Sequence, residues 1–202
     1  MPWIFGPAFP GHPKTVEMRE LKNLDVESRA KAFKARADAF FIKQVDHLQS
    51  PSLWVPFPLA VMTCIGIEMV GSYKFGDAPN DRNDHFKKTV EDIDVGFSTE
   101  QLTPKGDKKK LSCFIYQGFR NSLAHGYYGQ WVFITHDEKK ARTFRYSAAR
   151  NLVVLNVYWF YGQFKKTYNR YFSDLLAGTD SKHDPLKTFN ETLEKKFELW
   201  LR

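Results

Sequence analysis

The chain is organised around one stretch, Phe114-Ile115-Tyr116-Gln117-Gly118-Phe119-Arg120-Asn121-Ser122-Leu123-Ala124-His125-Gly126-Tyr127-Tyr128. Apolar side chains recur there at steps of three and four residues, which predicts an amphipathic helix over about residues 109–125. Gly126 then suits the positive φ found at a helix C-terminus. The fold is therefore expected to form around a buried helix with this apolar stripe: Leu111, Phe114, Ile115, Phe119, Ser122 and Leu123.

Three polar residues near the end of this helix form the candidate catalytic site. At about 100° per residue, Asn121 and His125 lie one turn apart on one face, and Arg120 lies beside Asn121. A histidine transfers protons near neutral pH, an arginine neutralises phosphate charge, and an asparagine orients either group. The negative end of the helix dipole favours protonated His125. Because the 2′-hydroxyl of RNA supplies a nucleophile, these groups predict RNA cleavage without metal or cofactor.

The same residues, Arg120-Asn121-Ser122-Leu123-Ala124-His125, resemble the R-N-x-x-x-H form of the motif of HEPN-domain proteins. The resemblance covers six residues and implies a compact all-helical domain, usually a homodimer. It also implies a metal-independent endoribonuclease of the kind found in toxin–antitoxin, phage-defence and CRISPR-associated systems. The alternative is a catalytically silent HEPN-like module for nucleotide or RNA binding or for dimerisation, in which the polar trio bridges helices.

Two residues are candidates for supporting the trio, Glu68 and Ser122. Residues 53–71 are strongly apolar, but Pro56, Pro58 and Glu68 leave too short a run to span a bilayer, so a buried helix is expected over about 58–74. A buried carboxylate needs a partner, and Glu68 is therefore expected to anchor Arg120 or another basic group. The alternative is that Glu68 points to solvent at the rim of its helix.

After Gly126 the apolar period changes from helical to alternating, which predicts a β-hairpin over residues 131–146 with its turn at 136–140. Aromatic and basic side chains gather in this part of the chain, as in sites where bases stack and cations pair with phosphates. The alternative is that the aromatic rings only cover the core. The candidate substrate-binding residues are Tyr127, Tyr128, Lys139, Lys140, Arg142 and Arg145.

The rest of the chain predicts a mainly α, HEPN-like helical bundle that forms a single domain over 1–202. Helices are expected over about 25–48, with Phe40 in the apolar stripe, and over 58–74 and 86–97. Two more are expected from the N-cap Ser147 to Gly178 and from Asp184-Pro185 onward. Residues 1–14 read as an extended N-terminal arm that packs on the domain or on a partner, or else as a tail. The helix expected to end at Gly178 has a wide apolar surface, which suits either a central place in the bundle or an intermolecular contact.

The net charge, the chemistry of cleavage and the resemblance each indicate a partner. The formal net charge of +7 suits RNA as a polyanionic partner. Cleavage needs both a base and an acid, yet the motif helix has one histidine, so a second copy of the chain is expected to share the site. The resemblance adds a possible antitoxin or defence-system protein.

Several other classes are not indicated by the sequence. Cys64 and Cys113 show no metal-like or redox-like spacing and suit the core of a protein in a reducing compartment. There is no glycine-rich phosphate loop, no zinc spacing and no secretory signal. The chain is therefore expected to be cytoplasmic, with no metal, no cofactor and no membrane partner.

Overall fold

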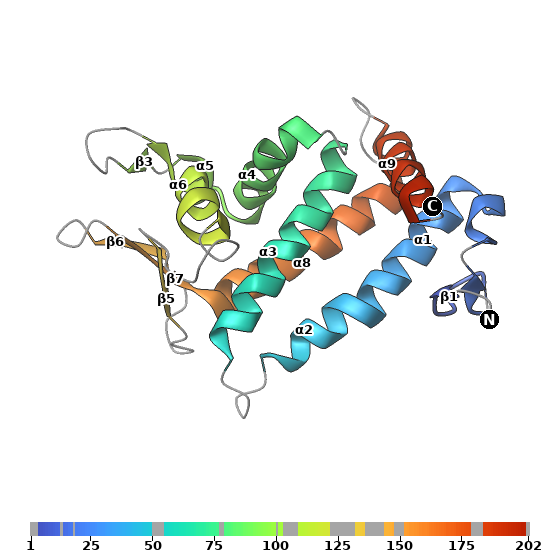
Figure 1. Cartoon of the computed structure of the whole chain (residues 1–202), viewed down its shortest axis with the longest axis horizontal. Helices are drawn as coiled ribbons and strands as arrows, with labels where there is room; N and C mark the ends of the chain where they lie inside the picture. The colour runs from blue at the N-terminus through green and yellow to red at the C-terminus, as the bar shows by residue number, and fades with distance from the viewer. Residues whose placement is uncertain are drawn as a thin grey trace.

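The computed structural model describes residues 4–12, 14–17, 19–49, 55–76, 79–99, 101–102, 109–121, 132–135, 144–147, 152–178 and 184–200. The described part is mainly helical, as the sequence predicted. Long helices α3 (Pro56–Phe75) and α8 (Val157–Ala177) cross the middle of the molecule, and a small sheet lies at one end (Figure 1). Around them lie α1 (Val26–Ala37), α2 (Lys43–His47), α4 (Arg82–Ile93) and α9 (Pro185–Trp200).

The first helical rod, which runs through residues 26–47, matches the predicted span but contains a π-helical segment. Asp25 caps it, since its Oδ1 accepts the Ser28 backbone N–H at 2.9 Å. Between α1 and α2, the segment η2 (Asp38–Ile42) makes bonds that reach back five residues, which inserts an extra residue into the turn. Side chains after α1 therefore no longer follow the α-helical period. Phe40, expected in the buried stripe, is 62% exposed, so that prediction was wrong.

Helix α3 packs between α4 and α8 and supplies much of the core. Its predicted span of 58–74 is confirmed to within two residues. Among the described residues, α3 alone is long and apolar enough to cross a membrane by length and composition. Half of that apolar window is buried inside the bundle, which fits the core helix of a soluble protein.

The long helix α8 begins nine residues later than expected. Ser147 was the predicted cap, but the helix starts at Val157, where the Asn156 side chain accepts backbone N–H groups of Tyr158 and Trp159 at 3.1 and 3.2 Å. The preceding residues form strand β7 (Leu152–Asn156). A short Leu-Val-Val-Leu run fits a buried strand as well as a helix, and its β-branched residues favour the strand.

The predicted β-hairpin is replaced by a three-stranded sheet. Strands β5 (Val132–Thr135) and β6 (Phe144–Ser147) lie where strands were expected, but they do not pair with each other. β7 lies between them, parallel to β5 and antiparallel to β6. The hairpin over 131–146 was therefore wrong as a pairing, because the segment expected to be helical supplies the middle strand. The predicted turn at 136–140 lies outside the described residues.

Three shorter elements lead into the motif helix: α5 (Gly96–Thr99) and the antiparallel pair β3 (Gln101–Leu102) and β4 (Lys109–Lys110). The described residues also include two 3-10 turns, η1 (Leu21–Asn23) and η3 (Pro79–Asp81).

The two ends of the chain close the bundle near α1 (Figure 1). In the N-terminal segment, β1 (Ile4–Gly6) pairs with β2 (Val16–Glu17) and packs against α1. α9 begins at Pro185 behind Asp184, as predicted, with the Asp184 Oδ1 accepting the Lys187 backbone N–H at 3.0 Å. The segment expected as an arm is therefore folded back onto its own chain over the described residues.

Candidate functional site

The motif helix has a π-helical turn directly before the candidate site. It consists of α6 (Leu111–Phe114) and the π segment η5 (Ile115–Arg120), followed by Asn121, whose backbone N–H reaches the Tyr116 carbonyl. The apolar stripe is confirmed where it is described, because Leu111, Phe114, Ile115 and Phe119 are at most 3% exposed. π turns recur at functional sites, since the extra residue moves a side chain off the regular helical face.

Arg120 is held by one side chain from another helix and one from its own. Its Nε donates to Glu68 Oε1 on α3, so the contact expected between these residues is present. Its Nη1 donates to Asn121 Oδ1 at 3.2 Å. Within the described residues these two bonds leave Nη2 without a hydrogen-bond partner. The guanidinium is therefore fixed in direction yet retains N–H donors for an anion.

The site is open to solvent. The side chains of Arg120 and Glu68 are 31% and 39% exposed, so a ligand can reach them. The hydrogen bond to Glu68, followed by the charge of that carboxylate, raises the pKa of Arg120, while partial burial opposes the rise. The arginine is charged at every physiological pH. It is thus able to stabilise negative charge on a phosphate at this edge.

Tyr116 supports the arginine from one turn earlier and was not singled out from the sequence. The Arg120 guanidinium carbon lies 5.8 Å from the centre of its ring, and Lys87 Nζ lies at the same distance. The Tyr116 hydroxyl donates to Asn83 Oδ1, which joins the motif helix to the start of α4. A sequence signal existed only for the first contact, because Tyr116 and Arg120 are four residues apart.

The thiol of Cys64 lies one turn before Glu68 on α3 but suits no catalytic role. Burial of Cys64 raises the pKa of its thiol, the negative charge of Glu68 raises it further, and Arg120 opposes them. The thiol therefore stays protonated, and a protonated thiol is a poor nucleophile. Among the described residues, no group of three His, Cys, Asp or Glu side chains is arranged to hold a metal ion.

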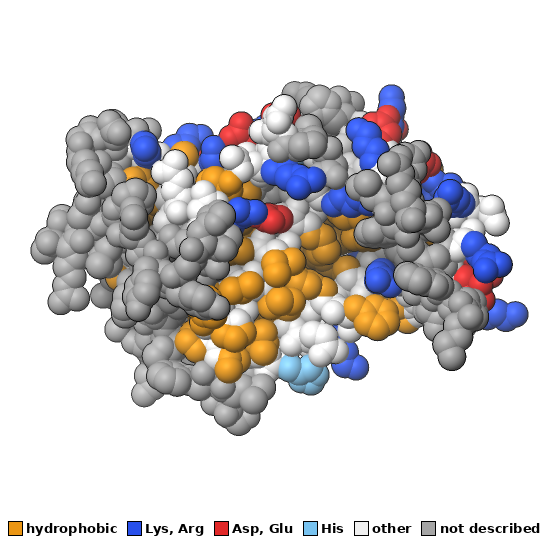
Figure 2. Space-filling view, in the orientation of Figure 1, with side chains coloured by type: hydrophobic (Ala, Val, Ile, Leu, Met, Phe, Trp, Pro, Cys, Tyr) orange, Lys and Arg blue, Asp and Glu red, His pale blue; other side chains and the backbone are white. Residues whose placement is uncertain are grey.

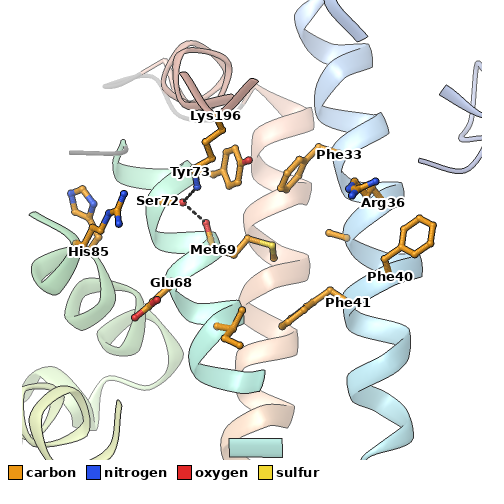
Figure 3. A pocket seen from close by; sticks show the side chains of 13 residues that line it. Phe33, Arg36, Phe40, Phe41, Glu68, Met69, Ser72, Tyr73, His85 and Lys196 are labelled. Carbon is orange, nitrogen blue, oxygen red and sulfur yellow. Dashed lines mark hydrogen bonds between the residues drawn. The ribbon is translucent and has the colours of Figure 1, made fainter. Parts of the chain in front are cut away.

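Glu68 also lines an apolar groove of about 540 Å³ between the first helical rod and α3 (Figure 3). Its apolar wall includes the exposed side chains Phe40 and Ile65, and Figure 2 shows hydrophobic side chains gathered across this face. Lys196 crosses it from α9 and donates to Ser72 Oγ at 2.8 Å. The groove therefore gives the Glu68–Arg120 pair an apolar neighbour with cationic side chains around it: Arg36, Arg82 and Lys196.

The other predicted site residues are not placed by the structure. The Arg145 backbone lies in β6, where it pairs with Val154, but its side chain is outside the described part of the chain. The remaining candidates also lie outside the described residues: Ser122, His125, Tyr127, Tyr128, Lys139, Lys140 and Arg142. The structure thus brings together Arg120, Asn121 and Glu68 and leaves the proton-transfer group a prediction.

Comparisons of the chain with protein-family models, with curated proteins and with solved structures gave no match.

Proposed function

We propose that this chain is a metal-independent endoribonuclease of the HEPN type that cleaves RNA through attack of the 2′-hydroxyl. The observation that carries the proposal is the placement of Arg120. Glu68 and Asn121 each accept one of its N–H groups, while 31% of its side chain remains exposed. A guanidinium held in this way meets a phosphate without first being ordered, which lowers the entropic cost of charge stabilisation.

The proposed reaction needs proton transfer at two oxygens. His125 of one chain removes the proton from the 2′-hydroxyl, and the resulting oxygen bonds to the neighbouring phosphorus while the bond to the 5′-oxygen breaks. A protonated histidine, the same residue of a second chain, gives its proton to the departing 5′-oxygen. Arg120 neutralises the additional charge on the phosphate. The products are a 2′,3′-cyclic phosphate and a 5′-hydroxyl.

The wider role follows from the sequence resemblance and from charge. The R-N-x-x-x-H motif supports a toxin or phage-defence protein that acts in the cytoplasm as a homodimer, with an antitoxin or defence protein as a further partner. The formal net charge of +7 supports RNA as the substrate, since cations near a site concentrate polyanions around it.

A catalytically silent HEPN-like module is the second candidate, and one observation favours it. The hydrogen bond from Arg120 to Glu68 joins the motif helix to α3. An arginine in that position also stabilises a helix contact with no substrate present. The two candidates differ in whether RNA is cut.

The test is incubation of purified protein with structured and unstructured RNA in excess EDTA. We expect products ending in 2′,3′-cyclic phosphate, with cleavage by Arg120→Ala and His125→Ala reduced about 100-fold or more while the fold is retained. Lys166→Ala, at an exposed position on α8, is the control and should cleave normally. Intact RNA at high protein concentration would instead support the silent module.

The shared site is tested by mixing chains. Light scattering should show a homodimer, and mixed dimers of wild-type and His125→Ala chains should be nearly inactive, because each site needs the histidine of both chains. Mixed dimers that keep half the wild-type rate, or a monomer at working concentration, would contradict a site shared between chains.

A further inference from the structure

A second cavity, of about 640 Å³, lies between α3, α4, α8 and the start of α9. Its size is in the range of small-molecule sites. Val70, Phe75, Leu175 and Pro185 give it apolar walls, and its lining includes none of Glu68, Arg120 and Asn121. The cavity shares His85 with the groove beside Glu68 but contains none of the proposed nuclease residues.

Two buried polar atoms in its lining have no hydrogen-bond partner among the residues that the structure describes. Among the described residues, the buried side-chain atoms without a hydrogen bond are His85 Nδ1 and Tyr171 Oη. Both residues are 7% exposed, and both line this cavity. Nearly all buried polar atoms in folded proteins are paired, because an unpaired one keeps its desolvation cost. Tyr171 lines this cavity, and His85 lines both it and the groove beside Glu68, so a ligand in this cavity is placed to complete both atoms.

Another tyrosine of the same helix shows the usual arrangement. The Tyr168 hydroxyl, also on α8, donates to Asp38 Oδ1 at 2.8 Å. Tyr171 is three residues further along and lacks such an acceptor among the described residues. Burial of a tyrosine on α8 therefore does not by itself leave its hydroxyl unpaired.

Cations surround the same space. Lys74 Nζ binds Asp92 at 2.6 Å, and Arg170 Nη2 donates to the Asp92 carbonyl at 2.9 Å. Lys88 Nζ lies 5.5 Å from the centre of the Phe75 ring, and it makes no ion pair with any residue that the structure describes. The lining contains these three cations and the carboxylate of Asp174, and the neighbouring Asp92 carboxylate pairs with Lys74, so a positive balance remains. Its charge therefore favours an anion.

We propose that this cavity binds a small organic anion whose phosphate or carboxylate group accepts hydrogen bonds from Lys88, Arg170, Tyr171 and His85. Those groups supply two positive charges and two otherwise unpaired polar atoms. The apolar walls hold the organic part of the ligand, with Phe75 offering an aromatic face. The cavity is far larger than a bare phosphate ion, so the organic part contributes to affinity.

The binding test is calorimetry on the full chain with four probes: phenyl phosphate, benzoate, inorganic phosphate and benzyl alcohol. Phenyl phosphate or benzoate should bind, with inorganic phosphate about ten-fold weaker and benzyl alcohol without measurable heat. The stronger of the first two identifies the acidic group. Absence of binding by both organic anions at millimolar concentration would overturn the proposal.

Matched substitutions locate the binding. Lys88→Met and Tyr171→Phe should each weaken the bound anion about ten-fold, since each loses a hydrogen bond to a charged group. Lys166→Met, exposed on α8, and Tyr168→Phe, outside the cavity lining, should leave affinity unchanged. Equal affinity of wild type and Lys88→Met would overturn the assignment.

Thermal melting of the ligand-free protein separates a ligand site from a structural one. Tyr171→Phe should raise Tm because it removes an unpaired buried hydroxyl, whereas Tyr168→Phe should lower Tm because it breaks the bond to Asp38. If an ordered water already bonded to the Tyr171 hydroxyl, Tyr171→Phe would lower Tm and leave anion affinity unchanged. That result would count against the proposed site.

Discussion

The two sides of α3 are built differently. Toward the core, Gly66 lies so close to α8 that a Cβ added there would be 2.5 Å from the Phe164 ring. Toward the edge, Glu68 is 39% exposed and holds Arg120 through one hydrogen bond. Buried aromatic packing contributes several kcal/mol, whereas exposed ion pairs contribute about 0–1 kcal/mol. Within two residues, α3 passes from the packing that stabilises the fold to the proposed chemistry.

The largest effect is expected on the core side. Phe164→Ala should lower the free energy of unfolding by about 3–5 kcal/mol, because Phe164 is fully buried between Gly66 and its ring neighbours Tyr161 and Tyr168. Denaturant titration measures the change. Phe40→Ala is the matched control and should cost about 0.5 kcal/mol or less, since Phe40 is 62% exposed. A loss below about 1 kcal/mol for Phe164→Ala would remove the contrast between the two sides.

On the edge side, stability and activity should separate. Glu68→Gln should change unfolding by less than about 1 kcal/mol, because both partners are part-exposed. RNA cleavage should fall about ten-fold, since a neutral amide orients the Arg120 guanidinium less strongly. Glu191→Gln, exposed on α9, is the control for both measurements. Unfolding and cleavage that fall together would show that Glu68 acts on the fold.

The smallest effect concerns a surface cap. The Ser28 backbone N–H, followed by the Ser28 hydroxyl, lowers the pKa of Asp25 from its ordinary value of 3.8. Because the folded pKa is the lower one, this stabilisation is complete above pH 3.8 and is lost as pH falls through the folded value. Asp25→Ala should remove that acid-side slope from the stability profile. If Asp25→Ala and wild type show the same slope, the loss of stability at acid pH must come from other groups.

The sequence predicted the main helices because their apolar residues follow the helical period over many turns. The spans near 25–48 and 58–74 and the Asp184-Pro185 start were found close to where they were expected. Phe40 failed for a local reason, since the π turn at Asp38–Ile42 breaks the period that placed it in the core. Periodicity assumes a regular helix and cannot reveal an inserted residue.

The small sheet was harder to predict. Residues 152–155 form a short apolar run that suits either a buried strand or the first turn of a helix, and only long-range pairing decides between them. Once this run is the middle strand, the pairing of 132–135 with 144–147 is no longer available. The hairpin prediction used only neighbours in sequence, whereas β5 and β7 pair across a longer connection.

Prediction of the site residues also succeeded where the signal was local in sequence and failed where no local signal marked the contact. Glu68 was singled out because a carboxylate in an apolar helix needs a partner, and the contact with Arg120 follows from that need. The contact between Tyr116 and Asn83 joins polar residues that are ordinary in their own segments, so neither attracted notice. His125 and the proposed RNA-binding residues remain predictions.

Asn156 links the sheet to the helical bundle in a way that bears on folding. Its backbone is the last position of β7, paired with Thr135, and its side chain caps the first turn of α8. No connecting residue separates the strand from the helix. The end of the sheet and the start of α8 should therefore order in one cooperative step, and their amide hydrogens should exchange with solvent at similar rates.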